Sequence, residues 1–299
     1  MNNIHAIKRV LAAQPFEGLF DQFGYPAFGA SMRLLGGNYS GGLVEVRAFN
    51  GSADQGTADI MPYKIGDEYW VDLNSTLENL DATAIGRGLT TSDTLGDLLS
   101  SGVNDYDGFV TTWFDQSGNA NDATQSTAAS QPQIASAGSL ITENGKPAVE
   151  FDVTTKYLRT SAFTTIAQPY TFFDVVFANN SIQFIRDGLT STERSALYII
   201  TTTRLAAGNT ATYSYTNNIQ SLYTSVYNGA STDLAQNGSA FETQDAGTNS
   251  ITGINIGGNL DNSAFPFLGR YQELIFYPSD QSADRTNIET NINNAFSIY

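Results

Sequence analysis

Short strand-like segments separated by polar turns recur along most of this sequence, and this pattern restricts the fold more than any other feature. Residues 43–49 (LVEVRAF) and 109–114 (FVTTWF) alternate apolar and polar side chains. Residues 170–178 (YTFFDVVFA) are apolar almost throughout, as expected of a strand that is buried on both faces. Asn-Gly pairs, which favour tight hairpin turns, occur at 50–51, 144–145, 228–229 and 237–238.

Many short strands with polar turns predict a β-sandwich or a β-barrel. Other strand-like segments are 147–151, 195–200, 211–216, 221–229, 251–258 and 270–277. Two helices are predicted in this region: 91–100, opened by Ser92 or Asp93, and 284–295, after Ser282. The sequence has no internal repeat and no long linker. We therefore expect one domain, residues 16–299, preceded by a short extension, residues 1–15.

The extension has an amphipathic pattern of its own. Ile4, Ile7, Val10 and Leu11 have helical spacing, and Pro15 ends the pattern. Two interpretations stay open: a fraying helix packed on the domain, or an anchor onto a partner protein. The extension lacks the apolar core of a signal peptide, and no apolar run reaches membrane-spanning length. Release as part of a virus particle, at the particle surface, fits these features.

Composition excludes several classes of function. Of the 299 residues only 15% are charged, against about 25% in typical domains. The net charge of −16 should repel phosphate backbones, so we expect no nucleic-acid partner. Without cysteine, the chain has no disulfide, thiolate metal site or cysteine nucleophile. Its single histidine, His5, excludes multi-histidine metal sites and leaves little room for a Ser-His-Asp triad.

A polar loop follows the strand-like segment 109–114. Asp115 can accept N–H groups across a turn, and Gly118 and Asn119 are predicted to supply positive φ. Alternatively, the oxygens of Asp115, Asn119, Asn121 and Asp122 could bind Ca²⁺, although their spacing is not that of an EF-hand loop. A sugar contact is the third interpretation. No other cofactor is expected.

The apolar residues of the strands predict the core. Trp113 lies in an alternating strand and is expected to be buried, whereas Trp70 could either stack on a sugar or join the core. Residues expected to be mostly buried are Phe172, Val175, Phe177, Ile256, Leu274 and Phe276.

Four segments carry a family resemblance: LLGGNYSGGLVEVRAFN (34–50), FVTTWFDQSGNANDATQ (109–125), LITENGKPAVEFD (140–152) and GINIGGNLDNSAFPFLGRYQELIFYPSD (253–280). In order, they resemble segments of the arabinofuranosidase B catalytic domain, over about residues 16–299. The final strand, turn and helix are similar to the end of concanavalin-A-like (laminin-G-like) jelly-roll domains, including those of phage structural proteins. The resemblance implies an all-β, concanavalin-A-like jelly-roll β-sandwich of two antiparallel sheets with a short C-terminal helix.

The resemblance also implies where catalytic carboxylates would lie. The family acid belongs to a Gly-Gly-Asp-Asn-Ser stretch, and Asn259 stands at the matching position here. The family nucleophile is a Glu, and Gln183 is the best counterpart. An amide neither forms a glycosyl ester readily nor delivers a proton at neutral pH. Asp261 and Glu193 are candidate replacements, or ordinary solvated acids; Gln183, Asn259 and Asp261 are the candidate binding residues.

The sequence thus leads to two functional hypotheses. The first is a non-catalytic virion structural protein (a capsid decoration, spike or fibre component) that binds other virion proteins, and in one version a host surface glycan. We expect such a protein to form a homo-oligomer. The alternative is an arabinofuranosidase-like glycoside hydrolase with substituted catalytic carboxylates.

Overall fold

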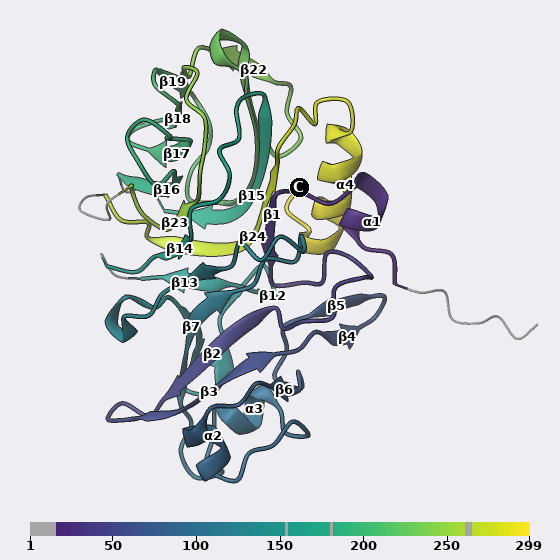
Figure 1. Ribbon diagram of the computed structural model, residues 1–299, viewed down its shortest axis with the longest axis vertical. Coiled ribbons are helices and arrows are strands. Elements are labelled where there is room, and N and C mark those ends of the chain that lie inside the picture. The colour runs from purple at the N-terminus through teal and green to yellow at the C-terminus, as the bar shows by residue number, and fades with distance from the viewer. Residues whose placement is uncertain (1–15, 153–154, 180–181, 261–264) are drawn as a thin grey trace, which may run out of the picture.

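The fold is a β-sandwich, as predicted. The computed structural model describes residues 16–152, 155–179, 182–260 and 265–299. Every pairing between its named strands is antiparallel. Figure 1 shows two layers of strands in the upper part of the molecule and a smaller group of strands below them. No helix of the described residues is long and apolar enough to cross a membrane.

The first layer is built around two long central strands, which pair along almost their whole length. One of them is β24 (Gly269–Tyr277), and two shorter strands, β1 (Phe28–Ser31) and β13 (Val149–Phe151), share its outer edge. In spatial order the layer contains β22 (Glu242–Gln244), β21 (Thr232–Gln236), β20 (Gln220–Tyr227), β15 (Tyr170–Ala178) and β24 (Gly269–Tyr277), followed by β1 (Phe28–Ser31) and β13 (Val149–Phe151).

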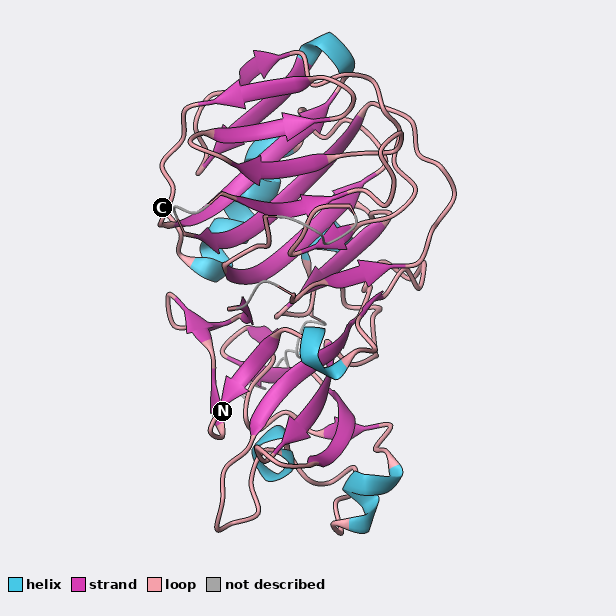
Figure 2. Cartoon of the chain, turned by 90° about the vertical axis from the view of Figure 1, so that its left-hand side faces the viewer, coloured by secondary structure: helices cyan, strands magenta, loops and turns pink. Residues whose placement is uncertain are grey.

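The second layer faces the first and completes the sandwich. Figure 2 shows its strands stacked in the upper part, with the C-terminal helix behind. In spatial order this layer contains β14 (Leu158–Thr160), β23 (Asn255–Ile256), β16 (Gln183–Asp187), β17 (Ala196–Ile199), β18 (Thr203–Ala206) and β19 (Thr210–Tyr213).

The lower strands connect the two layers. β9 pairs with β13 of the first layer, and β8 pairs with β14 of the second. The two predicted sheets are therefore continuous through hydrogen-bonded strands, and together they form one sheet of 20 strands in the part of the chain that the structure describes. The lower strands of this sheet are β2 (Val44–Phe49), β3 (Asp54–Ile60), β6 (Leu77–Glu78), β7 (Asp107–Trp113), β8 (Ala123–Thr124), β9 (Gln133–Ser136) and β10 (Ser139–Leu140). Two small hairpins add β4 (Tyr63–Ile65) with β5 (Glu68–Trp70), and β11 (Thr142–Glu143) with β12 (Lys146–Pro147).

The described residues form four α-helices beside the strands. The predicted C-terminal helix is α4 (Arg285–Phe296), which begins after Asp284. Ser282 does not cap it, because its hydroxyl donates to Asp280 instead. The predicted helix 91–100 shrinks to α3 (Leu95–Leu98), capped by Thr94 rather than by Ser92 or Asp93. The sequence did not predict α1 (Leu19–Phe23) or α2 (Ala82–Gly86); two 3₁₀ turns are Ala128–Ser130 and Gly229–Ser231.

The first layer is buried on both faces, which explains the unbroken apolar run of β15. Phe172 and Val176 point into the core between the layers, whereas Phe173 and Val175 pack outward under α4. Ile288 and Ile292 of α4 cover the outward side chains. Every residue of the predicted core set is buried except Phe177, which is half-buried near the end of β15.

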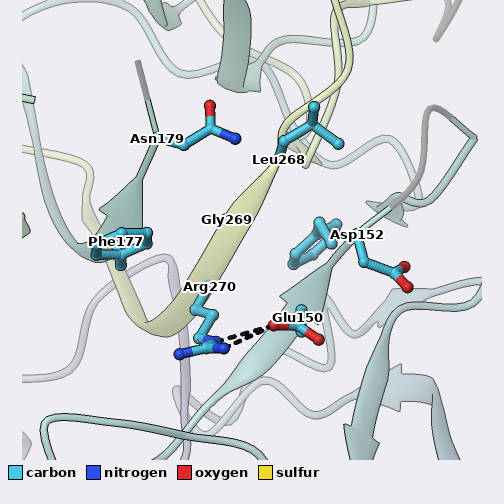
Figure 3. A pocket seen from close by; sticks show the side chains of 8 residues that line it. Glu150, Asp152, Phe177, Asn179, Leu268, Gly269 and Arg270 are labelled. Atoms are coloured by element: carbon cyan, nitrogen blue, oxygen red, sulfur yellow. Dashed lines mark hydrogen bonds and ion pairs between the residues drawn. The ribbon is translucent and has the colours of Figure 1, made fainter. Parts of the chain in front are cut away.

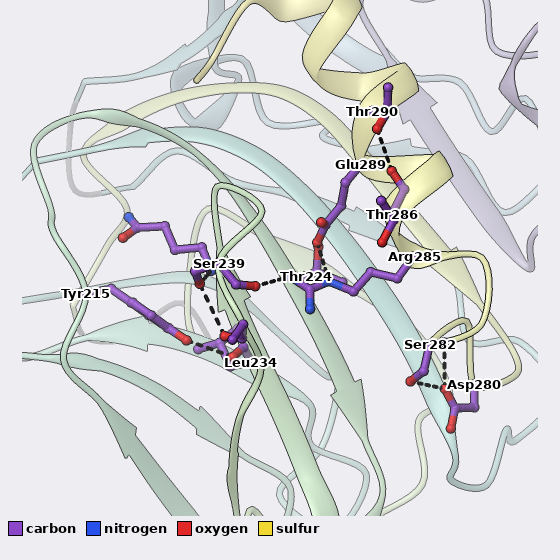
Figure 4. Close-up of polar contacts among 12 residues, drawn as sticks. Tyr215, Thr224, Leu234, Ser239, Asp280, Ser282, Arg285, Thr286, Glu289 and Thr290 are labelled. Atoms are coloured by element: carbon purple, nitrogen blue, oxygen red, sulfur yellow. Dashed lines mark hydrogen bonds and ion pairs between the residues drawn. The ribbon is translucent and has the colours of Figure 1, made fainter.

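The α4 helix is fixed to the first layer by polar contacts as well as by apolar packing. Figure 4 shows Glu289 of α4 between Thr224 of β20 and Arg285 of the same helix. Thr224 Oγ1 donates to Glu289 Oε1, and Arg285 Nε donates to the same oxygen at 2.7 Å. The Arg285 guanidinium also lies 3.9 Å above the ring of Phe241. These contacts set the helix at a fixed position on the outer face.

Both tryptophans belong to the cores. Trp113 is fully buried between the layers, edge-to-face with Tyr271. Trp70 is buried under α4, edge-to-face with Phe296, and Lys146 lies 4.4 Å above its ring. The core interpretation of Trp113 is confirmed, and burial leaves Trp70 no exposed face for a sugar. The amphipathic pattern of residues 4–13 lies outside the described residues.

Candidate functional site

Gln183, which the sequence resemblance aligned with the arabinofuranosidase nucleophile, makes structural contacts. Its side chain is fully buried at the start of β16. Its Oε1 accepts the backbone N–H of Leu268 at 2.9 Å, and its Nε2 donates to the carbonyl and side-chain oxygens of Asn179. The side chain therefore holds two loops together. The predicted role of Gln183 in ligand binding stays a prediction.

A shallow hollow lies directly against the residues that Gln183 holds. It has a volume of about 390 Å³, and Asn179 and Leu268 form part of its lining. Figure 3 shows Glu150 and Arg270 on the neighbouring strands β13 and β24, joined by an ion pair of 2.9 Å. Asp152, also on this lining, pairs with Lys156 at 2.7 Å. Both carboxylates of the hollow are therefore already neutralised by a cation.

Asn259, which the sequence resemblance aligned with the arabinofuranosidase acid, lies near the other end of β16. Its carbonyl accepts the side-chain N–H of Asn255, and the next residue, Leu260, donates its backbone N–H to Asp187 Oδ2 at 3.3 Å. Asp187 ends β16, four residues after Gln183, which is roughly 13 Å along a strand. The structure therefore does not bring Gln183 and Asn259 together. The third candidate, Asp261, lies outside the described residues.

Asp187 is a carboxylate that the sequence analysis missed. It is buried, pairs with Arg194 at 2.9 Å, and accepts the N–H of Gly188. Burial raises the pKa of Asp187 above its ordinary value, and the Arg194 guanidinium only partly opposes this rise. The available signal was its place at the end of an apolar strand segment (SIQFIRD), where an acid needs a partner.

Aromatic rings cover the outer face of the second layer beside Asp187. Phe184 and Tyr198 stack with ring centres 4.6 Å apart, and Phe265 stacks on Phe184 at 6.3 Å. Phe265 is 49% exposed, and the Arg194 guanidinium lies 5.1 Å above the Phe184 ring. We call Phe184, Tyr198 and Phe265 the aromatic platform. Phe184 and Tyr198 are buried, so Phe265 is the ring of the platform that offers exposed apolar surface, next to the Arg194–Asp187 pair.

The polar loop 115–122 is organised around Asp115. The Asp115 carboxylate is buried and accepts four hydrogen bonds: from the N–H groups of Gly29, Ser117 and Asn121, and from the Ser117 hydroxyl. These bonds fill the positions that a cation would take, and they tie the loop to β1. The structure therefore supports the turn interpretation.

The remaining candidate cation ligands also serve the fold. Asp122 accepts the N–H of Asp115 at 2.8 Å, and Asn119 and Asn121 donate their side-chain N–H groups to the carbonyl of Ala27. Positive φ occurs at Gly118 as predicted, but the second such residue is Ala120, not Asn119. Within the described part of the chain, no three His, Cys, Asp or Glu residues gather as a metal site.

Glu193, the other candidate replacement carboxylate, is half-buried near Asp187. Its Oε2 accepts the hydroxyl protons of Thr252 at 2.8 Å and of Thr190 at 3.2 Å. Glu193 therefore fastens the loop after β16 to the segment before β23. The next residue, Arg194, pairs with Asp187. Glu193 and Asp187 therefore belong to one polar cluster at the end of β16.

In the comparisons with known proteins, matches to this chain were found among solved structures. No model of a known protein family matches the chain, and no curated protein sequence does. A GH54 α-L-arabinofuranosidase soaked with a cyclic sulfate inhibitor has a TM-score of 0.60 at 17% identity, covering 94% of this chain and 65% of that chain. An arabinofuranosidase complexed with arabinofuranosyl-α-1,2-xylobiose gives the same score and identity, covering 94% and 64%. Domain 4 of a GH43 arabinanase from Geobacillus stearothermophilus, in complex with arabinotriose, has a TM-score of 0.42 at 12% identity, covering 59% and 91%.

The match to the arabinofuranosidases concerns the fold. At 17% identity the likeness confirms the predicted similarity in architecture, and this chain spans about 65% of the length of those enzymes. The predicted relation to phage structural proteins stays a prediction.

Proposed function

We propose that this chain is a non-catalytic carbohydrate-binding β-sandwich protein of a virus particle. The observation that carries the non-catalytic part is at Gln183. The position matching the family nucleophile holds a buried amide, and both of its polar groups are hydrogen-bonded within the fold. A group in this state neither attacks a sugar carbon nor meets a ligand from solvent.

Carbohydrate binding is assigned to the aromatic platform. Exposed aromatic rings give a sugar ring a flat apolar surface, and neighbouring charged groups bind its hydroxyls. Phe265 supplies the exposed ring, and Arg194 supplies donors at the edge of the stack. The architecture, which matches that of arabinofuranosidases, supports this choice of ligand class without fixing the sugar.

Two assays test this proposal together. The wild-type protein should release no nitrophenol from 4-nitrophenyl α-L-arabinofuranoside, and it should bind at least one immobilised plant or bacterial glycan. Phe265→Ala should weaken that binding about tenfold, which corresponds to about 1.4 kcal/mol. Ile182→Ala is the control, because Ile182 is a comparably exposed apolar residue outside the aromatic stack. If glycan affinity is unchanged in Phe265→Ala, the binding site does not include the aromatic platform.

One observation favours the alternative, a hydrolase with substituted carboxylates. Asp187 is buried with a raised pKa, as a general acid requires, and it contacts the residue after Asn259. If the chain hydrolyses arabinofuranosides through Asp187, then Asp187→Asn should abolish turnover, and Glu193→Gln should do so if Glu193 acts with it. If the wild-type protein hydrolyses arabinofuranosides and either variant loses this activity, the non-catalytic proposal is wrong.

The place in a virus particle is a separate part of the proposal. It is supported by the low content of charged residues and by the sequence resemblance to phage jelly-roll proteins. Mass spectrometry of purified particles should find peptides of this chain in amounts comparable with other structural proteins. Peptides found only in the particle-free fraction would contradict this placement.

A further inference from the structure

A second hollow lies at one end of the sandwich, where several strands begin or end. Its lining comes from residues just before β1, just before β15 and just after β24, and from the loop 115–122. Its volume of about 510 Å³ falls within the roughly 300–1,000 Å³ of small-molecule sites. We call it the strand-end pocket. Loops at the end of a rigid sandwich are common places for binding sites.

Two aromatic rings form apolar walls of this pocket. Tyr25 is 43% exposed, its ring packs against Phe20 at 5.6 Å, and its hydroxyl donates to Asp21 at 3.2 Å. Phe163 stacks on the buried Phe276 with ring centres 6.1 Å apart. Both rings are held by packing before any ligand arrives. A ligand with flat apolar faces therefore contacts rings that are already ordered, so binding loses little side-chain entropy.

Two carboxamides supply polar groups on the same lining. The side-chain nitrogens of Asn119 and Asn121 donate to backbone carbonyls of Pro26 and Ala27, at 2.9–3.3 Å. Their side-chain oxygens accept no hydrogen bond from the described residues. Because the nitrogens are fixed, each oxygen has a set direction and is ready to accept a hydroxyl proton.

The charge of the pocket restricts the ligand further. None of its lining residues is charged, and the whole chain carries a net charge of −16. A cationic ligand finds no carboxylate there, and an anionic ligand meets an acidic protein without a compensating cation. Aromatic walls, fixed amide oxygens and the lack of charge together match a neutral molecule with both apolar faces and hydroxyl groups.

We propose that the strand-end pocket binds an uncharged saccharide of one or two sugar units, as a site separate from the aromatic platform. The sugar faces contact Tyr25 and Phe163, and its hydroxyls donate to the Asn119 and Asn121 oxygens. The inference rests on the proposed carbohydrate binding and deepens it, because two separate sites on one chain would let it hold a branched or repeating glycan at two points.

Saccharide titrations of the full chain test this site. The probes are L-arabinose, D-xylose and arabinotriose, with N-acetylneuraminic acid as the anionic comparison, followed by saturation-transfer NMR and calorimetry. Tyr25→Ala should weaken binding of the neutral sugars at least about tenfold, whereas Tyr25→Phe, which keeps the ring, should change it less than about twofold. Thr164→Trp should fill the pocket and block binding. Thr165→Trp is its control, because Thr165 is exposed next to the pocket but does not line it.

The outcomes separate this inference from the proposed function. With two sites, the titration has a pocket component and a platform component. Loss of the pocket component in Tyr25→Ala and Thr164→Trp supports the strand-end pocket, provided that Thr164→Trp melts like the wild type and that Phe265→Ala keeps this component while losing the platform component. Neutral sugars that bind the Tyr25 and Thr164 variants as tightly as the wild type overturn the pocket but leave the platform proposal intact. A wild-type chain that binds none of these sugars, and no glycan on the array, overturns both. Tighter binding of the anionic sugar overturns the assignment of ligand class.

Discussion

At the scale of single residues, the interior of the sandwich contains an ion pair that water does not reach. Arg186 of β16 and Asp174 of β15 are both fully buried, with Nε and Oδ1 2.9 Å apart. Arg186 also donates to Ser225 and lies 3.6 Å above the ring of Phe172. Burial raises the pKa of Asp174, although Arg186 opposes that rise. The pair joins the two layers across the core.

Breaking this pair should be costly because it leaves an uncompensated charge inside. We expect Arg186→Met to lower the free energy of unfolding by about 3–5 kcal/mol in urea denaturation. Adding Asp174→Leu to that variant should recover much of the loss, since the lone carboxylate is then removed. The control is Arg204→Met, because Arg204 of β18 is only half-buried. This change should lower the free energy of unfolding by less than about 1 kcal/mol. Equal losses of unfolding free energy in the two arginine variants would show that the buried Arg186–Asp174 pair contributes no more to stability than a half-buried arginine.

Asp115 is the second residue whose role can be measured. Asp115→Ala removes the acceptor of four hydrogen bonds, so we expect a loss of about 2–4 kcal/mol in unfolding free energy. Asp105→Ala, at an exposed aspartate, should stay within about 0.5 kcal/mol. Added Ca²⁺ should leave the wild-type melting temperature unchanged. A Ca²⁺-dependent rise that disappears in Asp115→Ala would establish the cation site instead.

At the scale of elements, strands and helices depend on what covers them. α4 is only weakly apolar by itself, yet Ile288, Ile292 and Phe296 reach the same outer face of the first layer. α1 adds Leu19 and Phe20 to that face. Short helices of this kind are marginal alone in water and gain their stability from packing. The core under α4 therefore exists only in the assembled sandwich.

The N-terminal extension is expected to be dispensable for this packing. Deleting residues 1–14 keeps Phe16, which packs edge-to-face on Tyr69 at 5.2 Å, and keeps α1 whole. The melting temperature should therefore change by less than about 2 °C. If the extension anchors the chain to a partner, the truncated protein should fail to enter particles. Unfolding of the truncated chain, or its normal incorporation, would contradict the anchor hypothesis.

At the scale of the whole molecule, buried tyrosines make the fold sensitive to alkali. Burial raises the pKa of Tyr170 to about 12, and also raises the pKa values of the fully buried Tyr227 and Tyr271. The folded state keeps these phenols protonated, whereas the unfolded state releases their protons near pH 10. Their contribution to stability is thus complete below pH 10 and is lost as pH rises through the folded pKa values.

We therefore expect cooperative unfolding between about pH 10 and pH 12. Tyrosinate absorbance should rise in two steps, with exposed tyrosines ionising near pH 10 and the buried ones only as the circular dichroism of the strands is lost. A single ionisation step near pH 10 with unchanged circular dichroism would show that these tyrosines are accessible in the folded protein.

Several features could be predicted because the chain expresses them locally. The period of apolar residues gave β2, β7, β20 and β24, and the continuous apolar run matched β15 at both ends. The helix near the C-terminus was placed within one residue. Sequence resemblance to arabinofuranosidases also indicated the architecture, and the structural match at 17% identity agrees with it. The strand and helix predictions depend on spacing between neighbours in the sequence, whereas the architecture was implied by the resemblance.

Contacts between distant segments were decided only by the tertiary structure. The resemblance to arabinofuranosidases aligned Gln183 and Asn259 with a pair of catalytic carboxylates. In the structure the Gln183 side chain accepts the N–H of Leu268, whereas the residue after Asn259 contacts Asp187, because these contacts depend on loops joined to different strands. The pairing of Arg186 with Asp174 and the walls of the strand-end pocket likewise involve residues far apart along the chain. Side-chain periodicity specifies which face of a strand is buried; which residues meet there follows only from how the layers pack.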